Sequence, residues 1–94
     1  METTIQQATV GKSYRVAIQT KYLSPTNYRG SRLKVWHGDS KAMTLSWDYS
    51  LDTADNHAEA VQAYLDHMEW DGQWIIGALP NGTGYVAVWA GNNL

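Results

Sequence analysis

Cysteine and phenylalanine are absent from the chain, and proline occurs only twice in its 94 residues. The absence of cysteine excludes disulfides and thiolate metal sites, and it fits a reducing cytosol. No apolar run approaches the roughly 18 residues that a membrane span requires, and the N-terminus lacks the apolar core of a signal peptide. We therefore expect one cytoplasmic domain, residues 1–94, that does not enter a membrane.

Lysine and arginine are missing from the second half of the chain. Residues 1–41 hold all seven basic residues against two acids, which gives this part a charge of +5. Residues 42–94 hold the other seven acids and no basic residue, which gives −7. Such an asymmetry can mark a binding surface. The alternative is that the two halves simply attract each other across the fold and keep the protein soluble.

Signatures of catalysis are also missing. No serine lies in a nucleophile elbow, and His37, His57 and His67 are the only side chains that titrate near neutral pH. His57 and His67 are ten residues apart, which is a poor helical spacing for two ligands of one metal. We therefore predict a protein that is not an enzyme and that has no metal site and no cofactor.

Polar and apolar residues alternate in three segments, 14–22, 32–37 and 42–48, as half-buried strands require. The turns between them are rich in Pro, Asn, Gly and Asp, so the three strands are expected to form an antiparallel meander. Residues 1–12 have only Ile5 and Val10 as large apolar anchors. This N-terminal segment is either flexible or a short edge strand.

The spacing of apolar residues becomes helical after Asp52. Asp52 or Thr53 is a good N-cap, a helix is expected over 56–70, and Asp71-Gly72 is expected to end it. Two further strands, 73–79 and 85–90, are joined by a hairpin turn at 80–84. The apolar stripe of the helix consists of Ala58, Val61, Leu65 and Met68.

The predicted order is β-β-β-α-β-β, an α+β fold in which one mostly antiparallel sheet has a single helix packed on one face. A chain of this length has nothing left to cover the other face. The strand residues expected to face the helix are Leu33, Val35, Met43, Leu45, Val86 and Val88. Their neighbours would face away, and these are Arg15, Lys21, Arg32, Lys34, Trp36, Tyr85 and Trp89, with Trp74 as a further candidate. A slip of one residue would invert any of these strands.

The predicted binding surface joins that uncovered face to the turn before the second strand. It consists of Lys21, Asn27, Tyr28, Arg29, Arg32, Lys34, Trp36, Tyr85 and Trp89. Aromatic rings among cations are used by readers of single-stranded nucleic acid, and they also dominate protein-binding hot spots. Two further alternatives are self-association into a homodimer and plain cross-strand packing of the tryptophans. An alternative acidic surface lies on the helix and consists of Asp55, Glu59, Asp66 and Glu69.

Residues 20–32, T-K-Y-L-S-P-T-N-Y-R-G-S-R, resemble a segment found in small uncharacterised proteins encoded by phages, plasmids and integrated elements. In that family an N-H-x-x-A-like helix and a closing Y-V-F/A-V strand follow. Here Asn56-His57, Ala60 and residues 85–88 stand in those places. The resemblance implies an origin in a mobile element and brings no activity with it.

Residues 58–90 resemble the helix–hairpin half of a small anti-CRISPR protein directed at a type I effector complex. The shared features are Ala58, Ala60, Ala63, Met68-Glu69-Trp70, an aromatic residue near Trp74 and an apolar closing strand. Together, these features predict a mobile-element protein that binds and inhibits or modulates a host protein or protein–nucleic-acid complex, in the host cytoplasm. The expected target is a nucleic-acid-handling defence complex. The alternative is a protein that binds single-stranded nucleic acid.

Overall fold

The computed structural model describes residues 16–91. Its elements are β1 (Ile18–Leu23), β2 (Arg32–His37), β3 (Met43–Ser46), α1 (Thr53–Met68), β4 (Gln73–Ala78) and β5 (Tyr85–Gly91). The predicted α+β fold with the order β-β-β-α-β-β is therefore confirmed. The predictions for residues 1–12 and for Arg15 fall outside the described residues.

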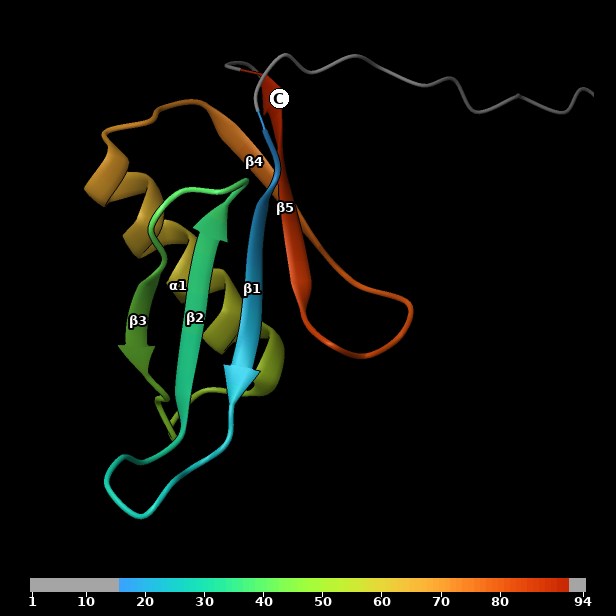
Figure 1. The fold of residues 1–94 in the computed structure, drawn as a ribbon. Coiled ribbons are helices and arrows are strands. Elements are labelled where there is room, and N and C mark those ends of the chain that lie inside the picture. The colour runs from blue at the N-terminus through green and yellow to red at the C-terminus, as the bar shows by residue number, and fades with distance from the viewer. Residues whose placement is uncertain (1–15, 92–94) are drawn as a thin grey trace, which may run out of the picture.

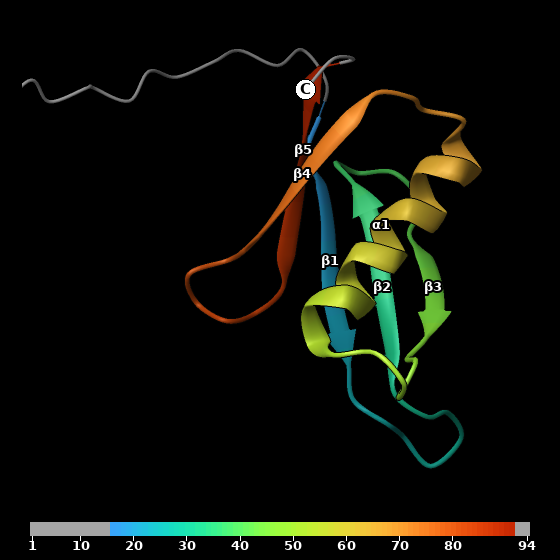
Figure 2. The ribbon, with the colours of Figure 1, turned by 180° about the vertical axis from the view of Figure 1, so that it is seen from behind.

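The five strands form one sheet in the order β3-β2-β1-β5-β4, and every neighbouring pair is antiparallel. β1 is the central strand, with β2 on one side and β5 on the other. Figure 1 shows the sheet in front of α1, and Figure 2 shows α1 in front of the sheet. The helix packs mainly against β2 and β1, and the loop end of the β4–β5 hairpin extends away from it (Figure 1).

Both ends of α1 follow from local chemistry. The Asp52 carboxylate accepts a hydrogen bond from the backbone N–H of Asp55 at 2.8 Å, so the predicted N-cap is confirmed. The helix ends at Met68, earlier than predicted, because Glu69 adopts the left-handed conformation (φ 58°, ψ 37°). This bend turns the ring of Trp70 back toward His37, with 4.9 Å between the ring centroids.

The helix buries a different stripe from the one predicted. Val61 and Leu65 are buried as expected, but Ala58 and Met68 are only half-buried. The remaining buried positions of α1 are Asn56, His57, Ala60 and Tyr64. Asn56 and His57 are polar, and an apolar pattern cannot reveal them. Their burial is stabilised by hydrogen bonds to other parts of the chain.

The predicted faces of the first three strands are confirmed, but β5 is shifted by one residue. Thr20 is buried beneath the helix, and Tyr85 is its directly opposite partner on β5. Directly opposite residues share a face, so Tyr85 and Ala87 face the helix. Val86 and Val88 therefore face away, contrary to prediction.

Two tryptophans of the β4–β5 hairpin also lie on the opposite face of the sheet from the one predicted. Trp74 packs against the core and stacks on Trp70, with 5.9 Å between ring centroids. Trp89 is the cross-strand partner of Trp74, and strand alternation places it on the same face as Ala87. The prediction that Tyr85, Trp89 and Trp74 lie on the uncovered face is therefore wrong.

Candidate functional site

One candidate surface is the face of the sheet that α1 leaves uncovered, which we call the open face. Leu33 and Val35 are buried on the helix side of the sheet. Because side chains alternate along a strand, their neighbours point to the open face, which therefore carries three cations and one indole. These residues are Lys21, Arg32, Lys34 and Trp36. The prediction that these four residues share the uncovered face is confirmed.

No acidic residue lies on the described strands beside the cations of the open face. Lys21 and Lys34 are directly opposite each other on β1 and β2, an arrangement that destabilises a sheet. The Lys34 Nζ atom lies 4.9 Å from the centroid of the Trp36 ring, within range of a cation–π interaction. An anionic group bound here would relieve the repulsion between the two lysines.

The other half of the open face is apolar. Ile75 and Val88 are cross-strand partners whose side chains are 55% and 44% exposed. Val86, on the same face, lies opposite Gln19, and Gln19 lies opposite Trp36. The basic half and the apolar half are thus neighbours across β1. This apolar half was not predicted, because Val86 and Val88 were assigned to the core.

The turn between β1 and β2 presents Asn27, Tyr28 and Arg29 to solvent, and Tyr28 is 95% exposed. The Thr26 hydroxyl shapes this turn by accepting hydrogen bonds from the backbone N–H groups of Tyr28 and Arg29. Arg32 donates to the carbonyl oxygens of residues 24 and 30 at 3.4 and 3.2 Å. Arg32 therefore holds the turn, whereas Arg29 is left to solvent.

The predicted acidic surface lies on the far side of the molecule from the open face. Asp55, Glu59, Asp66 and Glu69 are all exposed. The Gln62 amide donates to the Asp66 carboxylate at 3.0 Å. Since α1 contains no Lys or Arg, this side of the helix stays negative along its length.

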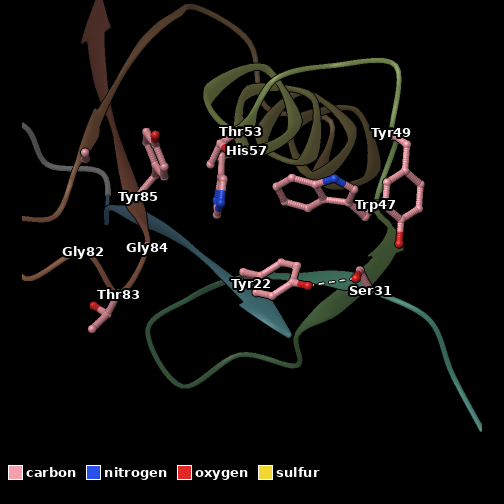
Figure 3. A pocket seen from close by; sticks show the side chains of 11 residues that line it. Tyr22, Ser31, Trp47, Tyr49, Thr53, His57, Gly82, Thr83, Gly84 and Tyr85 are labelled. Carbon is pink, nitrogen blue, oxygen red and sulfur yellow. Dashed lines mark hydrogen bonds between the residues drawn. The ribbon is translucent and has the colours of Figure 1, made fainter. Parts of the chain in front are cut away.

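A second candidate site is an aromatic cleft of about 480 Å³ between the start of α1 and the β4–β5 hairpin. Figure 3 shows its wall, to which Tyr22, Trp47, Tyr49, His57 and Tyr85 contribute side chains. Tyr22 meets Trp47 edge to face at 5.2 Å between centroids. The Tyr22 hydroxyl lies 2.8 Å from the Ser31 hydroxyl.

His57 is the only ionisable imidazole in this cleft, and it is 2% exposed. Its Nδ1 atom lies 2.6 Å from the Thr20 hydroxyl oxygen, and that hydroxyl donates to the Tyr85 carbonyl oxygen at 3.4 Å. With the hydrogen on Nδ1, the ring donates to the Thr20 oxygen, and the single proton of the hydroxyl is left for the Tyr85 carbonyl oxygen. Burial lowers the pKa of His57 below its usual 6.5, which favours the neutral ring.

Sequence reasoning did not find the cleft, since its residues come from four separate segments. One signal was present. His57, Ala60 and Tyr64 recur at helical spacing beside the buried Val61, which places a histidine on the inner face of α1. The contribution of Tyr22 and Trp47 depends on the packing of β1 against β3 through β2, which is a tertiary feature.

The lowered pKa of His57 predicts a pH-dependent stability. Above pH 6.5 both the folded and unfolded forms are neutral at this residue. Below pH 6.5 the unfolded chain binds the proton first, so the free energy of unfolding should fall until the folded form also binds it. Hydrogen bonds from Ser50 hold the pKa of the Asp48 carboxyl below 3.8, so Asp48 affects the stability only at lower pH. Urea unfolding between pH 4 and pH 7.5 measures the free energy of unfolding at each pH. In His57→Phe this free energy should depend less on pH. A wild-type profile without this fall would contradict the prediction.

A second, partly buried hydrogen-bond network centres on His37 and is structural. His37 Nδ1 contacts the hydroxyls of Tyr64 and Ser40, which ties the β2–β3 turn to α1. The Ser40 hydroxyl donates to the backbone carbonyl of His37 at 2.6 Å, so its proton is not directed to a base as a nucleophile requires. Among residues 16–91 no group of three His, Asp or Glu side chains is placed to hold a metal ion.

No helix in the described part of the chain has the length and apolar character needed to cross a membrane. Comparisons with protein-family models, with curated proteins and with solved structures give no match for this chain.

Proposed function

We propose that the protein is a non-enzymatic binding protein of a mobile element whose open face docks on a host protein. The observation that carries the proposal is the division of this face into a basic half, with Lys21, Lys34 and Trp36, and an exposed apolar half, with Ile75 and Val88. Apolar anchors next to cations suit a partner surface that is acidic at one side and apolar at the other.

Binding of single-stranded nucleic acid is the second candidate. The facing pair Lys21 and Lys34 favours it, because a phosphate between two ammonium groups would remove their repulsion. The register of β5 weighs against it, since a stacking platform needs several rings. With Tyr85 and Trp89 on the helix side, Trp36 is the one aromatic side chain that the described strands place on the open face. We therefore favour the host protein, and a nucleic-acid-handling defence complex is its expected source.

Matched charge reversals test the proposal. Lys34→Glu changes the open face, whereas Lys41→Glu makes the same change in the exposed β2–β3 turn. Val88→Asp changes the apolar half. We expect a host protein captured from a host-cell lysate by the wild type and by Lys41→Glu to be lost with Lys34→Glu and with Val88→Asp. Its affinity for purified wild type should fall as salt rises.

Two outcomes would contradict the proposal. One is that no lysate protein distinguishes Lys34→Glu from Lys41→Glu. The other is that single-stranded oligonucleotides bind the wild type, quench tryptophan fluorescence and lose affinity with Lys34→Glu but not with Val88→Asp. The second result would establish the nucleic-acid function instead.

A further inference from the structure

The aromatic cleft lies on the helix side of the sheet, so the open face and its partner do not account for it. Its volume of about 480 Å³ is within the range of small-molecule sites. Its wall is built largely from ring faces and edges, with His57 between Trp47 and Tyr85. The His57 and Tyr85 rings are 4.3 Å apart, and the His57 and Trp47 rings are 6.1 Å apart. A wall of this kind favours a flat, aromatic ligand.

One buried atom of the wall is left to make a polar contact. The His57 ring is nine-tenths or more buried, and its Nδ1 is occupied by Thr20. Its Nε2 has no hydrogen-bond partner among residues 16–91. The ring forms part of the cavity wall, so Nε2 is open to the cavity. With the hydrogen on Nδ1, Nε2 is an acceptor. A ligand that fills the cleft therefore gains by presenting an N–H group to it.

A basic cavity adjoins the cleft. It has a volume of about 520 Å³, includes Arg29 and Arg32, and shares Ser31, Trp47 and Tyr49 with the cleft. The Arg29 side chain is exposed and has no partner in the described part of the chain. A guanidinium group is well suited to bind a phosphate. The two cavities together thus match a molecule with a flat ring at one end and an anionic group at the other.

We propose that the cleft binds a nucleotide whose amino-bearing base lies against Trp47 and Tyr85 and donates an N–H to His57 Nε2, while its phosphate reaches Arg29. This site is separate from the open face and does not depend on the proposed function. Binding is non-covalent and needs no metal. The base contributes stacking and one hydrogen bond, and the phosphate contributes a contact that salt weakens.

Three ligands test the roles of the two ends. AMP has both the amino group and the phosphate, adenosine lacks the phosphate, and purine riboside lacks both the phosphate and the amino group. We expect adenosine to bind about fivefold more tightly than purine riboside. At low salt we expect AMP to bind about tenfold more tightly than adenosine. Isothermal calorimetry gives the affinities, and NMR shifts of the Trp47 and His57 ring signals locate the ligand.

Two pairs of variants separate the contacts from general damage. His57→Phe keeps a flat ring and should remove the preference for adenosine over purine riboside, while binding of purine riboside shows that the variant is folded. His67→Phe makes the same change at an exposed position of α1 and should leave the preference intact. Arg29→Ala should remove the advantage of AMP over adenosine, and Lys41→Ala should not.

The results also identify the source of the nucleotide. If a short oligoadenylate shifts the same Trp47 and His57 signals at much lower concentration than AMP, the ligand is a base of a single strand, and the cleft assignment stands. The proposal is overturned if millimolar AMP leaves these signals unchanged. It is also overturned if AMP shifts only Trp36 and Lys34, or if His57→Phe and His67→Phe have the same preference.

Discussion

Replacing Gly84 by alanine is expected to lower the free energy of unfolding by about 3 kcal/mol, because the added methyl group collides with the backbone of the central strand. A Cβ atom at Gly84 would lie 2.1 Å from the carbonyl oxygen of Thr20 and 3.2 Å from its carbonyl carbon. These are backbone atoms, so no side-chain rotation can relieve the contact. Urea unfolding followed by tryptophan fluorescence measures the loss.

The contact lies at a weak point of the sheet. β1 and β5 are paired over only three residues on each strand, from Ile18 opposite Ala87 to Thr20 opposite Tyr85. This pairing is where the β4–β5 hairpin joins the rest of the sheet. A small domain has a total stability of about 5 kcal/mol or slightly more, so Gly84→Ala should leave only about 2 kcal/mol, with roughly 3% of the molecules unfolded at 25 °C.

Gly77→Ala is the matched control for this prediction. Gly77 is also a strand-region glycine, but a Cβ atom there would meet nothing within 4 Å. We expect this variant to be as stable as the wild type or more stable by up to about 1 kcal/mol. Equal stabilities for the two variants would show that β1 and β5 do not approach each other as closely as the structure has them.

The same region shows what the sequence could and could not predict. Alternation assigned the faces of β2 and β3 correctly, since each has a clear apolar and a clear polar side. β5 reads Tyr-Val-Ala-Val-Trp-Ala, which is apolar on both sides, so periodicity cannot choose between its two registers. The choice is made by tertiary contacts, namely the pairing of Tyr85 with Thr20 and the absence of a side chain at Gly84.

The composition of the open face was predictable to the same extent. Lys21, Arg32, Lys34 and Trp36 lie on strands with unambiguous alternation, and all four were placed correctly on the uncovered face. The aromatic cleft was not predictable in this way. It forms where α1, β1, β3 and the β4–β5 hairpin meet, and its polar atom belongs to His57, which the predicted apolar stripe of α1 does not include.

The exchange of Asn56 for alanine is expected to have the second large effect, a loss of about 3 kcal/mol in the free energy of unfolding. Asn56 is 2% exposed. Its amide nitrogen donates to the carbonyl oxygens of residues 48, 51 and 52 at 2.9, 3.3 and 3.0 Å. Its amide oxygen accepts from the backbone N–H of Asp48 at 2.8 Å. Alanine would remove all four bonds and leave the Asp48 N–H without this acceptor, although the carbonyl oxygens of residues 48 and 52 keep the backbone N–H groups of residues 51 and 56.

Asn27→Ala is the matched control, since Asn27 is exposed in the β1–β2 turn and should change stability by less than about 0.5 kcal/mol. Hydrogen exchange gives a local readout, because the Asp48 N–H should lose protection in Asn56→Ala. A variant as stable as Asn27→Ala would contradict the prediction.

The segment that Asn56 holds contains Tyr49 and leads to Thr53, both of which line the cleft. Asn56→Ala should therefore weaken nucleotide binding in the molecules that remain folded, whereas the open face, on the side of the sheet away from α1, should bind its partner as before.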